Sequence, residues 1–464
     1  MFNRSIDDSA LPDSVGGRLV DGYLQLASSQ AWSYRKRPGL RLFCDLHSGA
    51  PVDAIYWWDA KSVGLAVSGG SLYKLNSPDG NCAKVDGDAL SVVGHTTFAD
   101  NGSYVIMASG GRMISYDNTN PPAFIADADA PTAVTHVAFL DRYILANQAN
   151  GSRFNWSDVN APLNWTSTSF ASPESKADTL LALHVGWREI TLFGRQSVEV
   201  WYNDGTTPFS RLEGAYLERG CIAANSIVNA GGVWMWLDDE RRVTMLEGRT
   251  PKLISGPYDD VIRGVAAVSD AYAQFISIGG HAYYLLTLPS VSLTVVYDLT
   301  TGAWYEWGYW DSDAGAYKEW LGRCSTYAIR WQKHLVGSRV DGKIYQLQAG
   351  TFTDAGTPIR TSFLSGQITH GSLAYKNSQE LILRCKRGAG GGNGEEPVFE
   401  VRWRDQSGPW SNHRQVSLGK IGERDSVRSL FRLGRYRMRQ WEIIHSDNTD
   451  FVLSGLEENV EAGE

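Results

Sequence analysis

The chain has 464 residues, of which 43% are hydrophobic, and a formal net charge of −8 at pH 7. A chain of this length exceeds what one hydrophobic core usually organises, so several domains or a modular array are expected. The acidic balance argues against a general nucleic-acid binder, because such proteins neutralise phosphates with excess lysine and arginine. Five scattered cysteines without a CxxC pair argue against a disulfide framework or a zinc site, and predict buried, reduced thiols.

Residues 1–50 are expected to form an extended N-terminal arm that enters the first repeat. Their first part is rich in Asp, Pro and Gly, and a short alternating stretch follows at 23–26. The basic group Arg35, Lys36 and Arg37 comes next. This group is either a solvated loop or, in the functional interpretation, a partner contact or a bend that leads into the first repeat.

One unit recurs between residues 51 and 350, and its clearest copy spans 180–202. There, apolar and polar residues alternate on both sides of a turn at Gly194, which is the pattern of a β-hairpin. Corresponding strands recur every 40 to 52 residues, at Leu72, Ile114, Phe154, Val198, Val243, Val295 and Ile344. This period is typical of four-stranded sheets arranged around an axis. The sequence therefore predicts an all-β fold with a β-propeller of six or seven blades over 51–350.

A polar, aromatic-tipped stretch at 155–178 is predicted to lie on the rim of the propeller. Loops in such positions commonly carry contacts, so Trp156, Asp158 and Trp165 are candidate interaction residues. The connector at 118–131 contains two aspartates but lacks the third acidic position, the glycine and the closing glutamate of a calcium loop. No metal site is expected there.

Residues 351–464 lose the repeat and are predicted to form a separate β-sandwich-like domain. Strands are expected at 357–366, 380–385, 398–405 and within 426–446, and the glycine-rich stretch 388–394 is expected to be a surface loop. The chain therefore divides into an arm, a propeller and a C-terminal domain.

The C-terminal part also carries the one dense group of basic residues: Arg424, Arg428, Arg432, Arg435, Arg437 and Arg439. Alternation along one strand would place Arg435, Arg437 and Arg439 on the same face, with a bulge near Gln440. This set is either a solvated strand face or a surface for charge-assisted contacts with a partner.

No known catalytic motif occurs in the chain. The nine histidines are dispersed, and His136 and His184 are interpreted as ordinary strand residues. The stretch from Asp405 to Trp410 resembles the Asp-box turn of sialidase-type propellers, but its glycine, Gly408, comes one position late, so a plain turn is favoured. Neither enzymatic activity nor a cofactor or metal is predicted.

Several stretches across the chain share a further likeness. They are Arg37-Pro38-Gly39, Trp156 to Trp165, Glu174 with Asp178, Leu192 to Tyr202, Trp403 to Trp410, Arg432 to Arg435 and Leu453 to Leu456. In these stretches the chain resembles the packaged-DNA stabilisation, or tail-nozzle (tail hub), proteins of short-tailed, podovirus-type bacteriophages.

The resemblance implies a structural role in the virion tail, after synthesis in the host cytoplasm. Such a protein would form a homo-hexameric ring below the portal and its adaptor, close the capsid after DNA packaging and form the DNA exit channel. It would dock tail fibres or tailspikes and a plug or needle. An acidic surface is compatible with double-stranded DNA that passes without sequence-specific binding. Direct membrane insertion is not expected, since the sequence contains no apolar run of about 18 residues and no signal peptide is recognised.

Two other functions remain open from the sequence. The 17 tryptophans and the turn at Asp405 are compatible with a carbohydrate-binding or glycoside-cleaving propeller. The chain could also be a cellular propeller scaffold that binds proteins through its rim. A stable six-fold ring would favour the tail protein, whereas turnover of a glycan would favour the carbohydrate-cleaving propeller and count against the tail protein.

Overall fold

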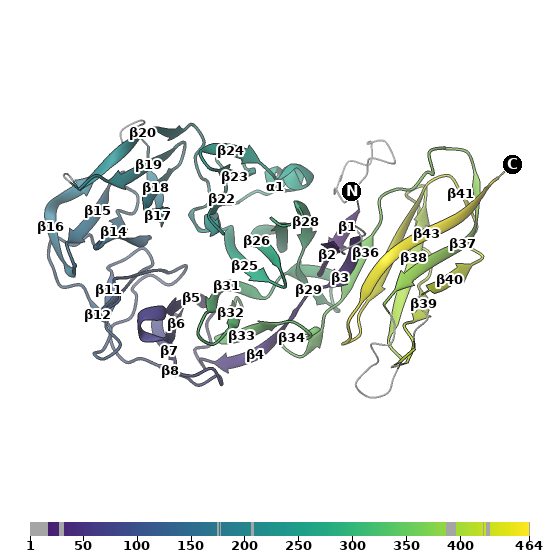
Figure 1. Ribbon diagram of the computed structural model, residues 1–464, viewed down its shortest axis with the longest axis horizontal. Coiled ribbons are helices and arrows are strands. Elements are labelled where there is room, and N and C mark those ends of the chain that lie inside the picture. Colours follow the sequence, from purple (N-terminus) through teal and green to yellow (C-terminus); the bar gives the residue numbers. More distant parts are fainter. Residues whose placement is uncertain are drawn as a thin grey trace.

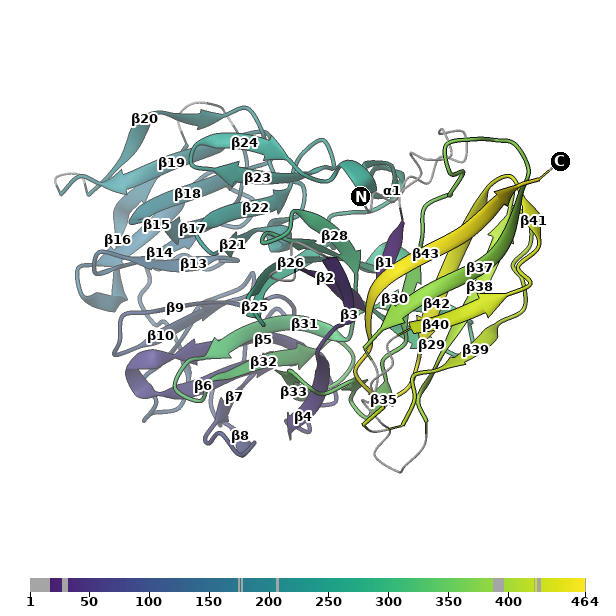
Figure 2. The same ribbon diagram turned by 45° about the vertical axis from the view of Figure 1, so that its right-hand side comes forward.

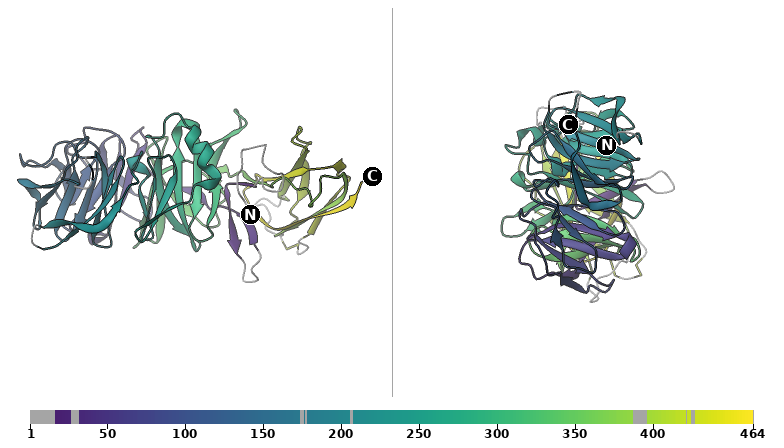
Figure 3. Two further views of the ribbon diagram at one scale, coloured as in Figure 1. Left: turned by 90° about the horizontal axis from the view of Figure 1, so that it is seen from above. Right: turned by 90° about the vertical axis from the view of Figure 1, so that its left-hand side faces the viewer.

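A computed structural model of the chain describes residues 17–26, 32–173, 176, 178–205, 208–386, 396–420, 422–423 and 427–463. It consists of a β-propeller beside a β-sandwich (Figure 1). The two bodies lie in line along the long axis of the molecule (Figure 3). The predicted all-β fold class is confirmed. Among the described residues, no helix has the length and apolar character needed to cross a bilayer.

The propeller has seven blades of four antiparallel strands. The first four blades are β5 (Val52–Trp58), β6 (Val63–Ser68), β7 (Ser71–Leu75) and β8 (Cys82–Lys84); β9 (Thr97–Asp100), β10 (Val105–Ala108), β11 (Ile114–Tyr116) and β12 (Ala123–Phe124); β13 (Val137–Leu140), β14 (Tyr143–Asn147), β15 (Phe154–Asp158) and β16 (Ala161–Ala171); and β17 (Leu180–Gly186), β18 (Glu189–Gly194), β19 (Val198–Asn203) and β20 (Phe209–Leu217).

The remaining blades are β21 (Val228–Ala230), β22 (Val233–Leu237), β23 (Val243–Glu247) and β24 (Thr250–Leu253); β25 (Tyr272–Ile278), β26 (His281–Leu288), β27 (Leu293–Asp298) and β28 (Ala303–Glu306); and β31 (Gly322–Ala328), β32 (Lys333–Ser338) and β33 (Lys343–Gln348) with β4 (Gly39–Asp45). Short helices are α1 (Asp259–Gly264) and the 3-10 turns Asp59–Lys61, Ala224–Ser226, Gly256–Tyr258 and Pro289–Val291.

All seven positions that marked the sequence repeat lie in the third strand of a blade, from Leu72 in β7 to Ile344 in β33. The repeat therefore gave the strand position correctly, and the blade count is seven. The middle strands of the blades are buried on both faces, as in β6 and β10, because each blade packs against a neighbour on either side. This explains why their sequences are almost continuously apolar rather than strictly alternating.

The N-terminal segment closes the ring. Strand β4 pairs antiparallel with β33 and supplies the fourth strand of the seventh blade, so that Cys44 lies opposite Ile344. The inner strand of that blade, β31, packs beside β5 of the first blade. The propeller is thus a ring whose last blade combines both ends of the propeller sequence. The ring is therefore closed by the backbone pairing of β4 with β33, because β4 continues along the chain into β5 of the first blade.

Strands from both ends of the chain build the sandwich (Figure 2). One sheet contains β1 (Arg18–Val20), β36 (Thr361–Leu364), β42 (Arg439–His445), β38 (Val398–Asp405) and β39 (Arg414–Ser417). The other contains β2 (Gly22–Leu26), β3 (Trp32–Lys36), β43 (Val452–Ala462), β37 (Lys376–Cys385), β40 (Val427–Phe431) and β41 (Arg435–Tyr436). The predicted arm thus contributes strands to both the propeller and the sandwich. The domain boundaries at residues 50 and 350 remain predictions.

The sandwich is joined to the propeller by one continuous sheet. Strand β1 pairs parallel with β28 of the sixth blade, where Val20 lies opposite Glu306, and antiparallel with β36 of the sandwich. Two small hairpins lie near this junction: β29 (Gly308–Asp311) with β30 (Ala316–Glu319), and β34 (Thr353–Asp354) with β35 (Thr357–Pro358). A single hydrophobic cluster runs through it, from Tyr283 and Trp307 on the propeller side to Trp441 in the sandwich.

The prediction of one bulged strand through Gln440 was wrong. Strand β41 pairs with β37 in one sheet, whereas β42 pairs with β36 and β38 in the other, without a register shift. The chain therefore crosses between the sheets at residues 437–438. The reason is local: Gly434 has a positive φ, and Tyr436 and Arg439 are both buried between the sheets.

A buried ion cluster lies where the N-terminal chain passes from the sandwich to the propeller. Arg37 is 0% exposed; its Nε donates to Asp21 at 2.7 Å and its Nη1 donates to Asp354 at 3.0 Å. Its Nη2 also donates to the carbonyl of Gly308 at 3.1 Å. Burial raises the pKa of the Asp21 carboxyl to about 6, although Arg37 opposes this shift. Arg37 thus connects three distant segments.

Lys36 is buried beside this cluster. Its Nζ donates to the carbonyl of Asp447 at 2.7 Å and lies 3.4 Å from Nδ1 of His445. Burial lowers the pKa of Lys36 to about 7. Of the predicted basic group, Lys36 and Arg37 are therefore engaged inside the chain and are not exposed to a partner. The reading of the group as a bend agrees with its place, whereas a contact through Arg35 stays a prediction.

Replacement of Arg37 tests this junction. Arg37→Met should lower the free energy of unfolding by about 3–5 kcal/mol, because it leaves two buried carboxylates without their cation. Chemical denaturation followed by tryptophan fluorescence measures this change. The control is Arg330→Met, which breaks an exposed pair with Asp59 and should cost less than about 1 kcal/mol. Equal effects of the two substitutions would contradict the role of Arg37.

Candidate functional site

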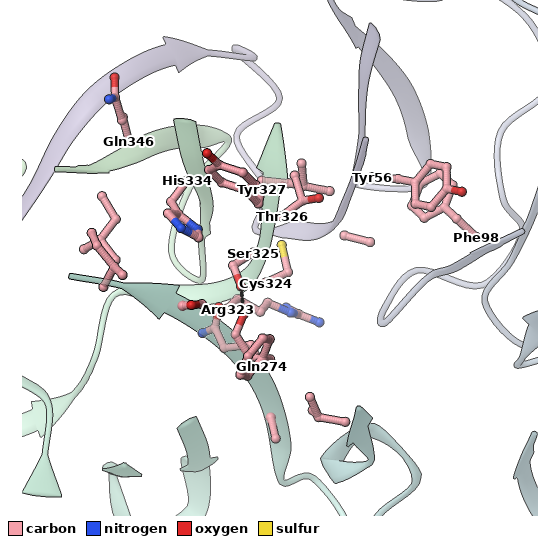
Figure 4. A pocket seen from close by; sticks show the side chains of 18 of the residues that line it. Tyr56, Phe98, Gln274, Arg323, Cys324, Ser325, Thr326, Tyr327, His334 and Gln346 are labelled. Carbon is pink, nitrogen blue, oxygen red and sulfur yellow. Dashed lines mark hydrogen bonds between the residues drawn. The ribbon is translucent and has the colours of Figure 1, made fainter. Parts of the chain in front are cut away.

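The axis of the propeller contains a cavity of about 1150 Å³, the propeller channel (Figure 4). All seven inner strands contribute to its wall, through Tyr56, Phe98, Val137, His184, Val228, Gln274 and Arg323. The wall extends between blades six and seven to Tyr327, His334 and Gln346. Concave sites with a few convergent polar groups are the usual places for ligands.

Three histidines form a row in the channel region. The ring centroids of His95 and His136 are 6.4 Å apart, and those of His136 and His184 are 5.3 Å apart. Burial lowers the pKa of His95 and of His184 to about 4, and it lowers the pKa of His136 further below its usual value. The three rings are therefore neutral at pH 7. Within the part of the chain that the structure describes, no group of three potential ligands is placed to hold a metal ion.

The reading of His136 and His184 as isolated strand residues was incomplete. His95 and His136 come just before the first strands of blades two and three, and His184 lies within the first strand of blade four, so the three are separated by roughly one blade repeat each. The repeat spacing therefore contained the signal that brings them together. Dispersed positions in a repeat protein become neighbours around the axis.

Polar groups lie close to the histidine row. Nη2 of Arg323 lies 3.2 Å from Oδ1 of Asp53, and burial raises the pKa of that carboxyl to about 6 against the opposing effect of Arg323. Nε2 of Gln274 donates to the carbonyl of Gly322 at 3.0 Å. Three buried atoms have no hydrogen-bond partner among the described residues: Oε1 of Gln274, Oδ2 of Asp53 and Nε2 of His184. Buried polar atoms usually have partners, so these mark an unsatisfied site.

Aromatic rings complete the wall. Tyr56 stacks on Phe98 with centroids 5.1 Å apart and planes 9° apart. Tyr327 and His334, on neighbouring strands of the seventh blade, have ring centroids 4.5 Å apart (Figure 4). The channel thus combines neutral polar groups with flat apolar surfaces.

The predicted rim residues serve mainly as core. Trp156 and Trp165 lie on the β15–β16 hairpin, and both indoles are buried in hydrophobic clusters. Asp158 is exposed and accepts a hydrogen bond from the hydroxyl of Thr166 at 3.1 Å. Only Asp158 therefore remains available on the surface. Glu174 lies outside the described residues, and Asp178 caps the β18–β19 turn by accepting from the backbone of Gln196 at 2.7 Å.

The six predicted arginines do not form one face. Arg439 is 1% exposed, pairs with Asp405 through two contacts of 2.7 and 2.9 Å, and donates to the carbonyl of Leu433. It is a structural residue of the sandwich interior. The same contacts show that the stretch after Asp405 is a turn of the sandwich, as favoured from the sequence, with its carboxylate already bound.

Two of the arginines share a surface site. The guanidinium carbons of Arg435 and Arg437 lie 4.2 and 4.3 Å from the ring centroid of Tyr375, and both arginines are exposed. Arg428 donates to the carbonyl of Ser417, Arg432 is exposed at a positive φ, and Arg424 lies outside the described residues. The sandwich thus presents the pair Arg435 and Arg437 as its best-defined basic surface.

The chain matches a known protein family over most of its length. The model described as "Bacteriophage P22 Gp10, beta-propeller" matches residues 26–352. The chain belongs to the bacteriophage P22 Gp10 family. The resemblance drawn from the sequence is therefore confirmed, and this member of the P22 Gp10 family is a structural protein of the phage tail and a virion component.

Two solved structures that are similar to this P22 Gp10 family member share 10% of its sequence or less. No match was found among curated proteins. The extracellular domain of the putative hybrid two component system BT4673 from B. thetaiotaomicron is 10% identical, with a TM-score of 0.44 over 83% of this chain and 48% of that chain, so about half of its length is spanned. An auxiliary nutrient binding protein from Bacteroides thetaiotaomicron is 8% identical, with a TM-score of 0.39 over 66% of this chain and 69% of that one.

Because its rings are buried and neutral, the histidine row predicts that the folding stability of this P22 Gp10 family propeller decreases as the pH falls below 6.5. For His184, the folded pKa of about 4 lies below the ordinary 6.5, so the unfolded state binds more protons between these values. Its contribution to stability is complete above pH 6.5 and is lost as the pH falls to about 4. His184→Asn, which cannot be protonated, should therefore show a shallower loss of thermal stability from pH 7 to 4.5 than the wild type.

The exposed His47 supplies the control. His47→Asn should keep the wild-type pH profile in the same melting experiments, because that side chain lies far from the channel wall on the surface. Profiles of identical slope for wild type and His184→Asn would contradict the assignment of a buried neutral imidazole.

Proposed function

We propose that the chain is one subunit of a homo-hexameric tail nozzle. The nozzle lies below the portal and its adaptor, closes the capsid after DNA packaging and forms the DNA exit channel. The observation that carries this proposal is the match to the P22 Gp10 family across residues 26–352, which covers the propeller together with its closing strand β4. The protein is made in the host cytoplasm and acts in the virion.

The physical properties of the chain suit a wall that resists pressure. The sandwich and propeller share a continuous sheet and one hydrophobic cluster, which favours a rigid unit. Propeller blades leave only short, protected edges, so the surface offers few unpaired strands to unwanted association. A net charge of −8 permits double-stranded DNA to pass without strong binding.

We propose that exposed side chains on the sandwich and on the propeller rim contact the partner proteins. The Arg435 and Arg437 pair is proposed to contact the adaptor or the neighbouring subunit through charge-assisted hydrogen bonds. The propeller rim is proposed to dock a tail fibre or tailspike and a plug or needle. Trp187, on the turn between β17 and β18, is 78% exposed, and tryptophan often dominates the energy of interfaces.

A glycoside-cleaving role finds no support in the described residues. The turn at Asp405 that suggested it lies in the sandwich, and its carboxylate is occupied by Arg439. The proposed function is therefore structural, without an assigned reaction.

Assembly of the purified protein tests this proposal. Mass photometry and negative-stain microscopy should find rings of six 51.2 kDa copies, alone or on isolated portal–adaptor complexes. The variant Arg435→Glu with Arg437→Glu should raise the concentration for half-assembly at least tenfold, since a charge-assisted hydrogen bond contributes about 1.5–3 kcal/mol.

The matched control reverses two exposed charges on the propeller, Lys61→Glu with Arg195→Glu. This variant should assemble as the wild type does. A wild-type chain that stays monomeric and does not bind portal–adaptor complexes would contradict the nozzle. A ring that forms equally well with both variants would remove only the role of the arginine pair.

A further inference from the structure

The propeller channel contains polar atoms that the chain itself does not satisfy. Gln274 is 5% exposed and uses its Nε2 to bind Gly322, while its Oε1 lies in the cavity wall without a partner among the described residues. Nε2 of His184, in the same wall, is also unpartnered. A buried acceptor without a donor is unfavourable, so a bound group that donates hydrogen bonds to these atoms is stabilised there.

The charge of the channel favours a neutral ligand. Its one guanidinium, Arg323, is already paired with the carboxylate of Asp53. The three histidines are neutral at pH 7, because burial holds the pKa of each of them below its usual value. An anionic ligand would have to compete with Asp53, and a cationic one would have to compete with Arg323. Neither is favoured over a neutral molecule with many hydroxyl groups.

The remaining wall offers flat rings and planar amides. Tyr56 with Phe98, and Tyr327 with His334, present ring faces or edges to the cavity. Gln332, Gln346 and Gln348 also line the cavity, and each can both donate and accept hydrogen bonds. Rings that pack against apolar C–H faces, beside amides that bind hydroxyl groups, match the two kinds of surface on a sugar ring.

We propose that the propeller channel binds a neutral oligosaccharide, with hydroxyl groups that donate to Gln274 and a sugar face that packs on Tyr327. A volume of about 1150 Å³ accommodates several linked sugar rings. A peptide is the alternative occupant, because Ile55, Val137 and Val228 also line the channel, and the binding experiment separates the two. This binding activity is separate from ring assembly, so it is tested on the single chain.

Ligand-observed NMR and calorimetry with maltotriose and chitotriose test the proposal. At least one of these neutral trisaccharides should bind with a dissociation constant at or below the low millimolar range. Tyr327→Ala and Gln274→Leu should each weaken binding at least fivefold while thermal melting confirms that they fold. Tyr309→Ala is the matched control, because Tyr309 is 41% exposed, close to the 44% of Tyr327, but lies outside the channel.

Two further probes test the other ligand classes: 3′-sialyllactose is a charged saccharide, and a Gly-Ser heptapeptide is a neutral peptide. If 3′-sialyllactose or the heptapeptide binds and neither neutral trisaccharide does, the assignment of a neutral saccharide is overturned. Failure of both neutral trisaccharides to bind, or binding that Tyr327→Ala and Tyr309→Ala weaken equally, would overturn the site. If Gln274→Leu fails to fold, the comparison of Tyr327→Ala with Tyr309→Ala decides alone.

Discussion

The buried guanidinium of Arg37 sets the geometry on which both bodies depend. Its carboxylate partners come from Asp21, between the first two strands, and Asp354, just after the last blade. Asp21 also accepts a hydrogen bond from the backbone of Gly308, and Asp354 accepts one from Leu40. Because unpaired buried charges are so costly, these segments have few alternative registers that keep every partner. The cluster therefore fixes the path of the chain more than it adds net stability.

From that cluster the chain can enter the ring in only one way. After Arg37 and Pro38, Gly39 begins β4 so close to the backbone of Thr353 that a Cβ atom would lie 2.3 Å from its carbonyl oxygen. This explains physically why Arg37-Pro38-Gly39 occurs at the start of a closing strand. The closed ring and the sandwich are then joined through β1, so that a force on one body is transmitted to the other.

The repeat could be predicted from the sequence because each blade is a local unit whose short strands and glycine turns recur at a regular spacing. The pairing of β4 with β33, about 300 residues apart, was not readable, since alternation gives a strand but not its partner. Charge was equally ambiguous: Arg439 and Arg435 look alike in the sequence, yet one is buried on Asp405 and the other is exposed. The histidine row could have been inferred by applying the repeat spacing to polar residues as well as to apolar ones.

We infer that the propeller and the sandwich unfold as one cooperative unit, because Arg37 and β1 join them. Hydrogen–deuterium exchange followed by mass spectrometry across a denaturant series tests it directly, because it reports unfolding for each segment separately. Peptides from β1, β4, the inner blade strands and β42 are expected to lose protection at the same denaturant concentration. Loss of protection in the sandwich and in β1 while the propeller stays protected would contradict it.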